Sequence, residues 1–425
     1  MTITLLFVLL LVLIMLGVPV AIALAGASLA FILSGTVPPM VVAHRMVNGV
    51  DSFPLLAVPF FILAGNLMNT AGITERIFNF ALALVGWMRG GLGHVNVGAS
   101  VIFAGMSGAA VADAGGLGAI EIKAMRDAGY KTDFAVGITA ASSTIGPIIP
   151  PSLPMVIYGV VAGASIGQLF AAGFIPGLVM AVALMLMVGF FARRRGFARD
   201  QPFAMKILGH SFKRAFLSLM TPVIIVGGIL SGAFTPTEAA VAACAYAMFL
   251  GAVVYRTLTL RRLIRVSYDT IETTSVVLLV VGAASIFAWI LTSNRVPEMA
   301  ANLLLGASDN PWVILLLINL ILLIVGCFME TVAAITILVP VLLPVAVTLG
   351  IDPVHFGVVV VLNLMLGLLT PPVGMVLYVL SRVANIPFER ALSGTAPFLI
   401  PLVIVLLLVT FVPGITMWLP TLLYR

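Results

Sequence analysis

Long stretches of the chain carry apolar residues with no charged side chain among them. Residues 1–44, 134–192 and 391–424 contain no Asp, Glu, Lys or Arg. A helix that crosses a lipid bilayer needs about 20 predominantly apolar residues, so each stretch has room for one or more membrane-spanning helices. The first stretch lacks a basic beginning and is apolar for longer than the roughly 7–15 residues of a secretory signal, so we interpret it as a retained membrane segment. The pattern predicts an all-α polytopic membrane protein.

Clusters of glycine and proline interrupt the apolar pattern at two places. Four prolines fall within 147–154, and the segment 367–374 holds two glycines around Pro371 and Pro372. Each proline removes a backbone N–H donor and obstructs the carbonyl one turn earlier, so no continuous helix passes through either segment. Unpaired carbonyls are costly in lipid and must line a cavity enclosed by protein or water. We therefore predict two broken helices whose free carbonyl and hydroxyl oxygens suit an alkali cation.

The helix breakers of the first half recur 221 positions later. The pairs are Gly105 and Gly326, Gly129 and Gly350, Gly146 and Gly367, and Pro150-Pro151 and Pro371-Pro372. The loop at 121–133 carries Lys123, Arg126 and Lys131, whereas its counterpart at 342–354 has neither Lys nor Arg. This difference predicts that the two loops lie on opposite sides of the membrane. Inverted structural repeats with broken helices around a midplane site are the architecture of secondary transporters.

Composition and charge support the membrane assignment and orient it. Apolar residues make up 62% of the chain and charged residues 8%, whereas a soluble domain is about 25% charged, and disorder requires low hydrophobicity. Lys and Arg concentrate in 193–214 and 256–265, so both segments are predicted to be cytoplasmic. The apolar runs 215–232 and 237–255 between them predict two spans that return the chain to the same side. A solvated amphipathic helix over 197–214 is the alternative, on the same face.

A predicted re-entrant hairpin precedes each broken helix. The first surrounds the small residues at 105–118, and the second begins at Gly326 and runs to Pro344. Each hairpin contains a carboxylate in apolar surroundings, namely Asp113 and Glu330. An ionisable residue within a membrane segment is a functional candidate, but a carboxylate is also favoured as a cap at a helix N-terminus. The sequence leaves both interpretations open for both residues.

Several other kinds of site are not supported. The four histidines are far apart in sequence, and Cys244 and Cys327 form no CxxC pair, so neither a haem nor a structural metal site is indicated. Ser107-Gly108 has no histidine or lysine base nearby in sequence, so serine hydrolysis is not supported. We predict that the protein is not an enzyme and does not bind nucleic acid.

Taken in order, five motifs resemble those of the large membrane subunit of tripartite ATP-independent periplasmic (TRAP) transporters. They are Gly105–Asp113, Ile145–Ser152, Gly232–Ala240, Phe328–Thr331 and Leu369–Gly374. The resemblance runs from about residue 3 to residue 420. Two positions depart from the family pattern: Ala109 stands where many relatives have a second serine, and Glu330 stands where many have aspartate.

The resemblance implies sodium-coupled uptake of a small organic acid, such as a dicarboxylate or a sialic acid, across the bacterial inner membrane. It also implies two partners, a small membrane subunit and a periplasmic solute-binding protein. A moving transport domain would slide against a fixed scaffold, as in an elevator. We predict that the transport domain comprises 91–175 and 311–390, and that the scaffold comprises 1–90, 176–310 and the C-terminal helix at 391–425.

The resemblance also assigns candidate ligands of the coupling ion, Na⁺, and of the substrate. The cation ligands are Ser107, Asp113, Ser142, Thr144 and Gly146 in the first half, and Glu330, Thr331, Gly367 and Thr370 in the second. The substrate ligands are Pro150, Pro151, Ser152, Asn363, Pro371, Pro372 and Gly374.

Two rival functions remain open from the sequence. The closer rival is a sodium–carboxylate symporter that works without a binding protein. A channel or a structural subunit of a respiratory complex is less consistent with two broken elements in pseudo-symmetric positions. Neither the identity of the acid nor the sodium stoichiometry follows from the sequence.

Overall fold

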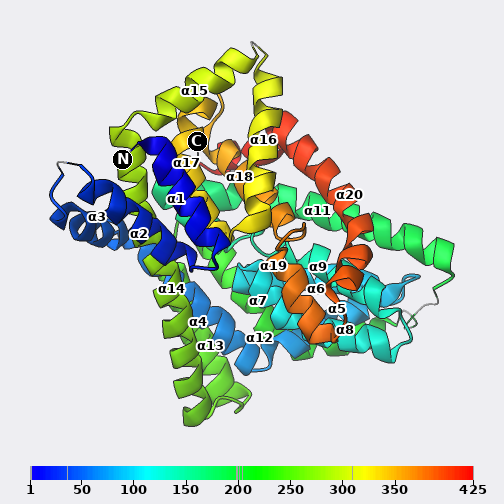
Figure 1. The fold of residues 1–425 in the computed structure, drawn as a ribbon. Helices are drawn as coiled ribbons and strands as arrows, with labels where there is room; N and C mark the ends of the chain where they lie inside the picture. The colour runs from blue at the N-terminus through cyan, green and yellow to red at the C-terminus, as the bar shows by residue number, and fades with distance from the viewer. Residues whose placement is uncertain are drawn as a thin grey trace.

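The computed structural model describes residues 2–35, 37–197, 200, 202, 204–308 and 310–424, without the side chains of residues 105–107, 305 and 307. Every regular element in these ranges is a helix (Figure 1). Eight of the described helices are long and apolar enough to cross a membrane. The prediction of an all-α polytopic membrane protein is confirmed.

The first half of the chain begins with short helices and ends with a long one. Its elements are α1 (Ile3–Met15), α2 (Val20–Leu33), α3 (Met40–Val50), the 3-10 turn η1 (Phe53–Leu56), α4 (Ala57–Thr70), α5 (Ile73–Val85), α6 (Gly91–Ser107), α7 (Ala110–Gly115), α8 (Leu117–Asp127), α9 (Thr132–Ser143), α10 (Leu153–Ala162) and α11 (Ile166–Arg195).

The second half begins after the basic linker. Its elements are α12 (Met205–Leu230), α13 (Pro236–Phe249), the π-helical turn η2 (Leu250–Val254), α14 (Leu260–Ser293), α15 (Val296–Ala307), α16 (Pro311–Phe328), α17 (Thr331–Thr348), α18 (Pro353–Gly367), α19 (Met375–Ala384), α20 (Phe388–Phe411) and α21 (Gly414–Leu423).

The helix boundaries repeat with the separation seen in the sequence. The end of α6 precedes the end of α16 by 221 positions, and the start of α9 precedes the start of α18 by the same number. The pair α7–α8 corresponds in the same way to the single helix α17, and the pair α3–α4 corresponds closely to the single helix α14. Both predicted breaks are present, between α9 and α10 and between α18 and α19. The helical repeat is therefore confirmed.

Contacts between the halves show that the two repeats are inverted. Arg390, at the start of α20, pairs with Asp133, at the start of α9, at 2.7 Å. The Tyr158 hydroxyl of α10 donates to the carbonyl of Pro353, at the start of α18, at 2.6 Å. Because a break separates α9 from α10, these contacts belong to opposite ends of one broken helix. The entry to each broken helix thus lies against the exit from the other.

The linker between α11 and α12 is held at the end of the molecule where α9 begins. One carboxylate oxygen of Asp200 accepts from the backbone N–H of Leu92 at 2.8 Å and from the Tyr130 hydroxyl at 2.7 Å. Burial and the neighbouring Asp200 carboxylate raise the pKa of Tyr130, so its hydroxyl keeps the proton that it donates. The basic segments and the loop between α8 and α9 therefore share one end of the molecule.

The predicted topology can be tested by labelling one cysteine at each end of the molecule. We expect a cysteine at Lys206 to be shielded from an impermeant maleimide in intact cells and a cysteine at Thr348 to be labelled. Both positions are exposed, and the positive-inside rule places the basic end in the cytoplasm. Labelling of permeabilised cells, in a background without Cys244 and Cys327, controls for accessibility. Equal labelling of both sites in intact cells would contradict the topology.

Candidate functional site

A large cavity lies where both hairpin tips and both helix breaks meet. Its volume is about 750 Å³, and α14 and the start of α2 form the opposite wall. The hairpin tips contribute 109–111 and 330–333, and the breaks contribute residues that include Pro147, Leu153 and Val373. The lining contains two acids, Glu272 and Glu330, and no Lys, Arg or His. The described lining therefore offers a negatively charged solute no positive side chain, although the Arg382 guanidinium donates to the hydroxyl of the lining residue Tyr378 at 2.6 Å.

Each hairpin tip is bonded to the break of its own half. The carbonyl of Gly108 accepts from the backbone N–H of Leu153 at 3.3 Å, and the carbonyl of Cys327 accepts from the N–H of Val373 at 3.3 Å. Gly108 has φ of 61°, a left-handed conformation that favours glycine. The two halves thus have the same arrangement, in which the tip of a hairpin is bonded to the non-helical backbone of the break.

The first predicted cation site brings Asp113 against the first break. Asp113 is 2% exposed, and a methyl group added to Gly146 would collide with its carboxylate. The α9 helix ends just before, at Ser143, so its last carbonyls point toward the same region. The Thr144 hydroxyl donates to the carbonyl of Ala141 at 2.6 Å. The side chain of Ser107, another predicted ligand, is outside the described residues.

A buried network that the sequence did not predict surrounds Ser142. The Ser142 hydroxyl donates to the amide oxygen of Asn96 at 2.6 Å. The amide nitrogen of Asn96 donates in turn to Glu121 at 2.8 Å and to Thr139 at 2.7 Å. The network joins both arms of the first hairpin to α9. The other carboxylate oxygen of Glu121 is buried with no hydrogen-bond partner among the described residues. This role of Asn96 was not predicted because its partners Glu121, Thr139 and Ser142 lie on other helices and are distant from it in sequence.

The second half places its predicted ligands at the tip of the second hairpin and in the second break. Glu330 caps α17, because its carboxylate accepts from the N–H groups of Val332 at 2.9 Å and Ala333 at 3.3 Å. Thr331 follows it and also lines the cavity. The Thr370 hydroxyl lies 2.8 Å from the sulfur of Cys327. The capping role of Glu330 is thus present in the structure, and its role as a cation ligand stays a prediction.

Two glycines allow the second hairpin to cross its broken helix closely. A methyl group on Gly367 would lie 2.6 Å from the Cα atom of Gly326, which is closer than real Cβ contacts. These are the repeat mates of Gly146 and Gly105. In the second half of the chain, close packing of the hairpin against the broken helix therefore explains why glycine recurs at these two positions.

Asn363, a predicted substrate ligand, is instead bonded to the second hairpin. Its amide nitrogen donates to the side-chain oxygen of Asn319 at 2.7 Å and to the Asn319 carbonyl at 2.9 Å. Asn363 lies 221 positions after Ser142, and both residues bond an asparagine on the first arm of the neighbouring hairpin. The two halves thus bond hairpin to broken helix at the same position of the broken helix, with Asn319 two positions beyond the repeat mate of Asn96.

The other predicted substrate ligands lie beside the cavity lining rather than in it. Pro150, Pro151 and Ser152 are buried, and the Ser152 hydroxyl donates to the carbonyl of Pro147. In the second break Pro371 and Pro372 are exposed and Gly374 is buried. Their neighbours Pro147, Leu153, Pro154, Leu368, Val373 and Met375 line the cavity instead. Contact between substrate and the predicted ligands stays a prediction.

The ligand atoms that the site offers to a cation are oxygen atoms. No group of three or more His, Cys, Asp or Glu side chains comes together among the residues that the structure describes. A cation held there would be bound by a single carboxylate with carbonyl and hydroxyl oxygens, which are ligands for hard cations.

Nearly the whole chain is similar in sequence to known proteins. Residues 7–415 match the family described as tripartite ATP-independent periplasmic transporter, DctM component. The chain is 56% identical over 396 residues to the sialic acid TRAP transporter large permease protein SiaM of Vibrio cholerae, covering 93% of each chain. It is 42% identical over 392 residues to the 2,3-diketo-L-gulonate TRAP transporter large permease protein YiaN of Escherichia coli, covering 92% of each.

A solved structure shares the fold. It is the crystal structure of the YdaH transporter of Alcanivorax borkumensis, with a TM-score of 0.59 over 88% of each chain and 17% sequence identity. At that identity the likeness concerns the fold alone, and it agrees with a polytopic helical membrane protein.

Proposed function

The chain belongs to the DctM-component family of tripartite ATP-independent periplasmic transporters, and from that membership we propose that it carries a sialic acid or a similar acid into the cell together with sodium. The resemblance drawn from the sequence motifs is thereby confirmed. The protein is a multi-pass protein of the bacterial inner membrane, it is a transporter rather than an enzyme, and it takes part in secondary uptake of organic acids. Sodium coupling, the acid and the mechanism of movement are the proposed parts.

The observation that carries the sodium proposal is the charge of the cavity. Its lining has two carboxylates and no cationic side chain, and Asp113 lies buried beside it in the first hairpin. An organic acid entering such a site needs positive charge from elsewhere, because an uncompensated charge is costly to bury. The C-terminal end of α9 carries partial negative charge and favours a cation next to Asp113. Sodium bound at the hairpins would supply the charge that the acid requires.

The proposed substrate follows from the comparison and the cavity. The chain is more similar to the sialic acid permease than to the diketogulonate permease, at 56% against 42% identity. A cavity of about 750 Å³ is within the range that holds small-molecule ligands. The polar groups that line it include Thr273, Thr331 and Tyr378, which can bond the hydroxyls of a sugar acid.

An elevator movement is supported by the wall opposite the hairpins. There α14 presents Val276, Val277 and Val280 to the cavity, next to Glu272 and Thr273, and the three valines form an apolar surface along which the hairpins and breaks can slide. The division into transport domain and scaffold made from the sequence stays a prediction. Each hairpin is bonded to the break of its own half, and the two broken helices are bonded to each other through Tyr158 and Pro353, so they would move as one body.

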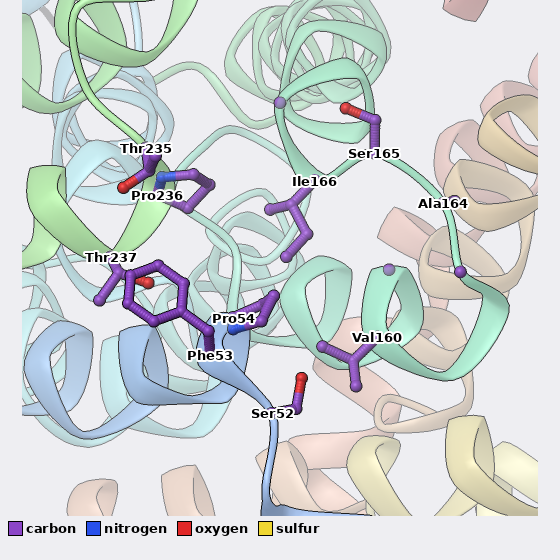
Figure 2. A pocket seen from close by; sticks show the side chains of 13 residues that line it. Ser52, Phe53, Pro54, Val160, Ala164, Ser165, Ile166, Thr235, Pro236 and Thr237 are labelled. Carbon is purple, nitrogen blue, oxygen red and sulfur yellow. The ribbon is translucent and has the colours of Figure 1, made fainter.

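The partners are proposed from family membership: a small membrane subunit and a periplasmic binding protein. The end of the molecule opposite the basic linker carries a cavity of about 470 Å³ between the turns at 52–54, 163–167 and 235–237. Figure 2 shows Phe53 and Thr237 on one side of it and Ile166 on the other. This is the face that a periplasmic protein would approach. The rival, a symporter without a binding protein, predicts transport by this chain alone.

We expect uptake by the reconstituted transporter to rise with sodium concentration with a Hill coefficient above one. The reason is that each hairpin and break offers its own set of oxygen ligands, and binding at both would close both tips over the acid. Sialic acid uptake into proteoliposomes, with the small subunit and binding protein present, measures it. Uptake driven equally well by a proton gradient in sodium-free buffer would contradict sodium coupling. Full uptake without the binding protein would favour the rival.

A further inference from the structure

A third cavity lies between α5 and the first turns of α12 and shares no lining residue with the substrate site. The two helices pack side by side (Figure 1), and the cavity between them has a volume of about 420 Å³. Arg76, Asn79 and Glu75 line it from α5, and His210, Ser211 and Arg214 line it from α12. It is therefore a polar cavity in a protein whose other surfaces are mostly apolar.

The cavity lies at the depth of the lipid headgroups. Arg214 is the last charged residue before the apolar run of α12, and the next one, Glu238, follows the end of that helix. The cavity is at the basic end of the molecule, because Ala71, just before α5, accepts from the hydroxyl of Thr257, beside Arg256, at 3.1 Å. By the positive-inside rule this is the cytoplasmic leaflet, where anionic lipids attract basic segments.

The two arginines are available to an anion. Among the described residues the one ion pair joins Arg390 and Asp133, so neither Arg76 nor Arg214 has a carboxylate within pairing distance. Arg76 is held in place, since its guanidinium stacks 3.7 Å from the ring centre of Tyr255 and donates to the carbonyl of Gly72 at 2.8 Å. Because this guanidinium is already held in place, it loses little further conformational freedom when it binds a phosphate.

Helix α5 does not need its charged side chains, Glu75 and Arg76, in order to fold. The repeat mate of α5 is α15, and its residues corresponding to Glu75, Arg76 and Asn79 are Val296, Pro297 and Ala300. The same architectural position thus folds without any of these polar side chains. They are present in the half of the repeat that lies at the basic end, which points to a role beyond packing.

From this cavity we infer that α5 and α12 bind the phosphodiester headgroup of an anionic phospholipid of the cytoplasmic leaflet. Arg76 and Arg214 hold the phosphate oxygens, and Glu75, Asn79 and Ser211 accept from or donate to the hydroxyls of a glycerol headgroup. A bound lipid then fastens α5 to α12 at the membrane surface, as basic pockets between membrane helices do.

Phosphatidylglycerol is the probe. The purified transporter, in detergent, is titrated with phosphatidylglycerol, with phosphatidylcholine or with inorganic phosphate, and the melting temperature is followed. We expect phosphatidylglycerol alone to raise it. Arg76→Gln and Arg214→Gln should raise the half-saturating lipid concentration at least about fivefold each, since one basic residue near the surface contributes about that factor. Lys213→Gln, the same charge change on an exposed neighbour outside the cavity, should change it less than about twofold.

Several results would overturn the inference. They are no response of the wild type to phosphatidylglycerol, an equal response to phosphatidylcholine, or unchanged half-saturation in both arginine variants. Saturation by inorganic phosphate at the same concentration would assign the cavity to a soluble anion and not to a lipid. Because Arg76 also stacks on Tyr255, its loss can lower stability without lipid. Arg214 is exposed, so the half-saturating lipid concentration of the Arg214→Gln variant is the decisive measurement.

Discussion

Gly367→Ala is expected to abolish uptake and to lower the thermal stability of the protein. The added methyl group would lie 2.6 Å from the Cα atom of Gly326 and 2.8 Å from its carbonyl oxygen. These are backbone atoms, so no side-chain rotation can make room and the hairpin must move away from the broken helix. Overpacking of this kind costs typically about 1–3 kcal/mol. Displacement of α18 at its last residue also displaces Thr370 and the tip contact between Cys327 and Val373, so the effect on uptake should exceed the effect on stability.

The matched control is Gly227→Ala in α12. A methyl group at Gly227 meets no atom within 4 Å, and alanine is the better helix former, so its stability and uptake should equal or exceed those of the wild type. Melting of the detergent-solubilised protein and sialic acid uptake into proteoliposomes measure both variants. Normal uptake by Gly367→Ala would show that hairpin and broken helix are not packed as described.

Asp113→Asn is expected to weaken sodium activation of uptake about 10- to 100-fold while leaving the protein folded. The amide keeps the shape of the side chain beside Gly146 but removes the negative charge that a cation at the first hairpin requires. Loss of a group that supports a bound metal has effects of this size on metal affinity. The measurement is the sodium concentration that gives half-maximal uptake at a fixed concentration of binding protein and acid.

Asp127→Asn provides the comparison, because Asp127 is exposed at the end of α8. The same chemical change should leave sodium activation within about twofold of the wild type, as expected for a surface charge. If Asp113→Asn keeps wild-type sodium activation and its melting temperature, the negative charge of Asp113 is not needed to bind the cation. The first cation site would then have to be sought among the carbonyls of the break.

The breaks and hairpins could be predicted from the sequence because their residues act locally. A run of Gly, Pro-Pro and Pro cannot continue a helix whatever surrounds it, and both predicted breaks are present. Single prolines gave no such guidance: α17 continues through Pro340 and Pro344, and α20 continues through Pro397 and Pro401. In these helices the surrounding apolar residues pack well enough to offset the lost hydrogen bonds, a tertiary effect that no local pattern shows.

The polar clamps could not be predicted, because they depend on residues that are distant in sequence. Asn96, Glu121, Thr139 and Ser142 come from three helices, and no local pattern indicates that these helices bring them together. The same limit applied to the substrate site. The sequence located the breaks, but which residues of a break face the cavity depends on how the broken ends are turned. Leu153 and Val373 face it, and the adjacent Ser152 and Pro372 do not line it.

The pairing of each broken helix with the opposite repeat has a consequence for how the protein is made. Gly137 of α9 and Gly394 of α20 are so close that a methyl group on either would collide with backbone of the other helix, and Phe134 packs edge-to-face against Phe398 nearby. The ribosome completes α9 long before α20 exists. The face of α9 that packs against α20 therefore has no protein partner from that helix until the end of the chain is inserted. Packing of α9 is thus completed late, when the last helices of the chain enter the membrane.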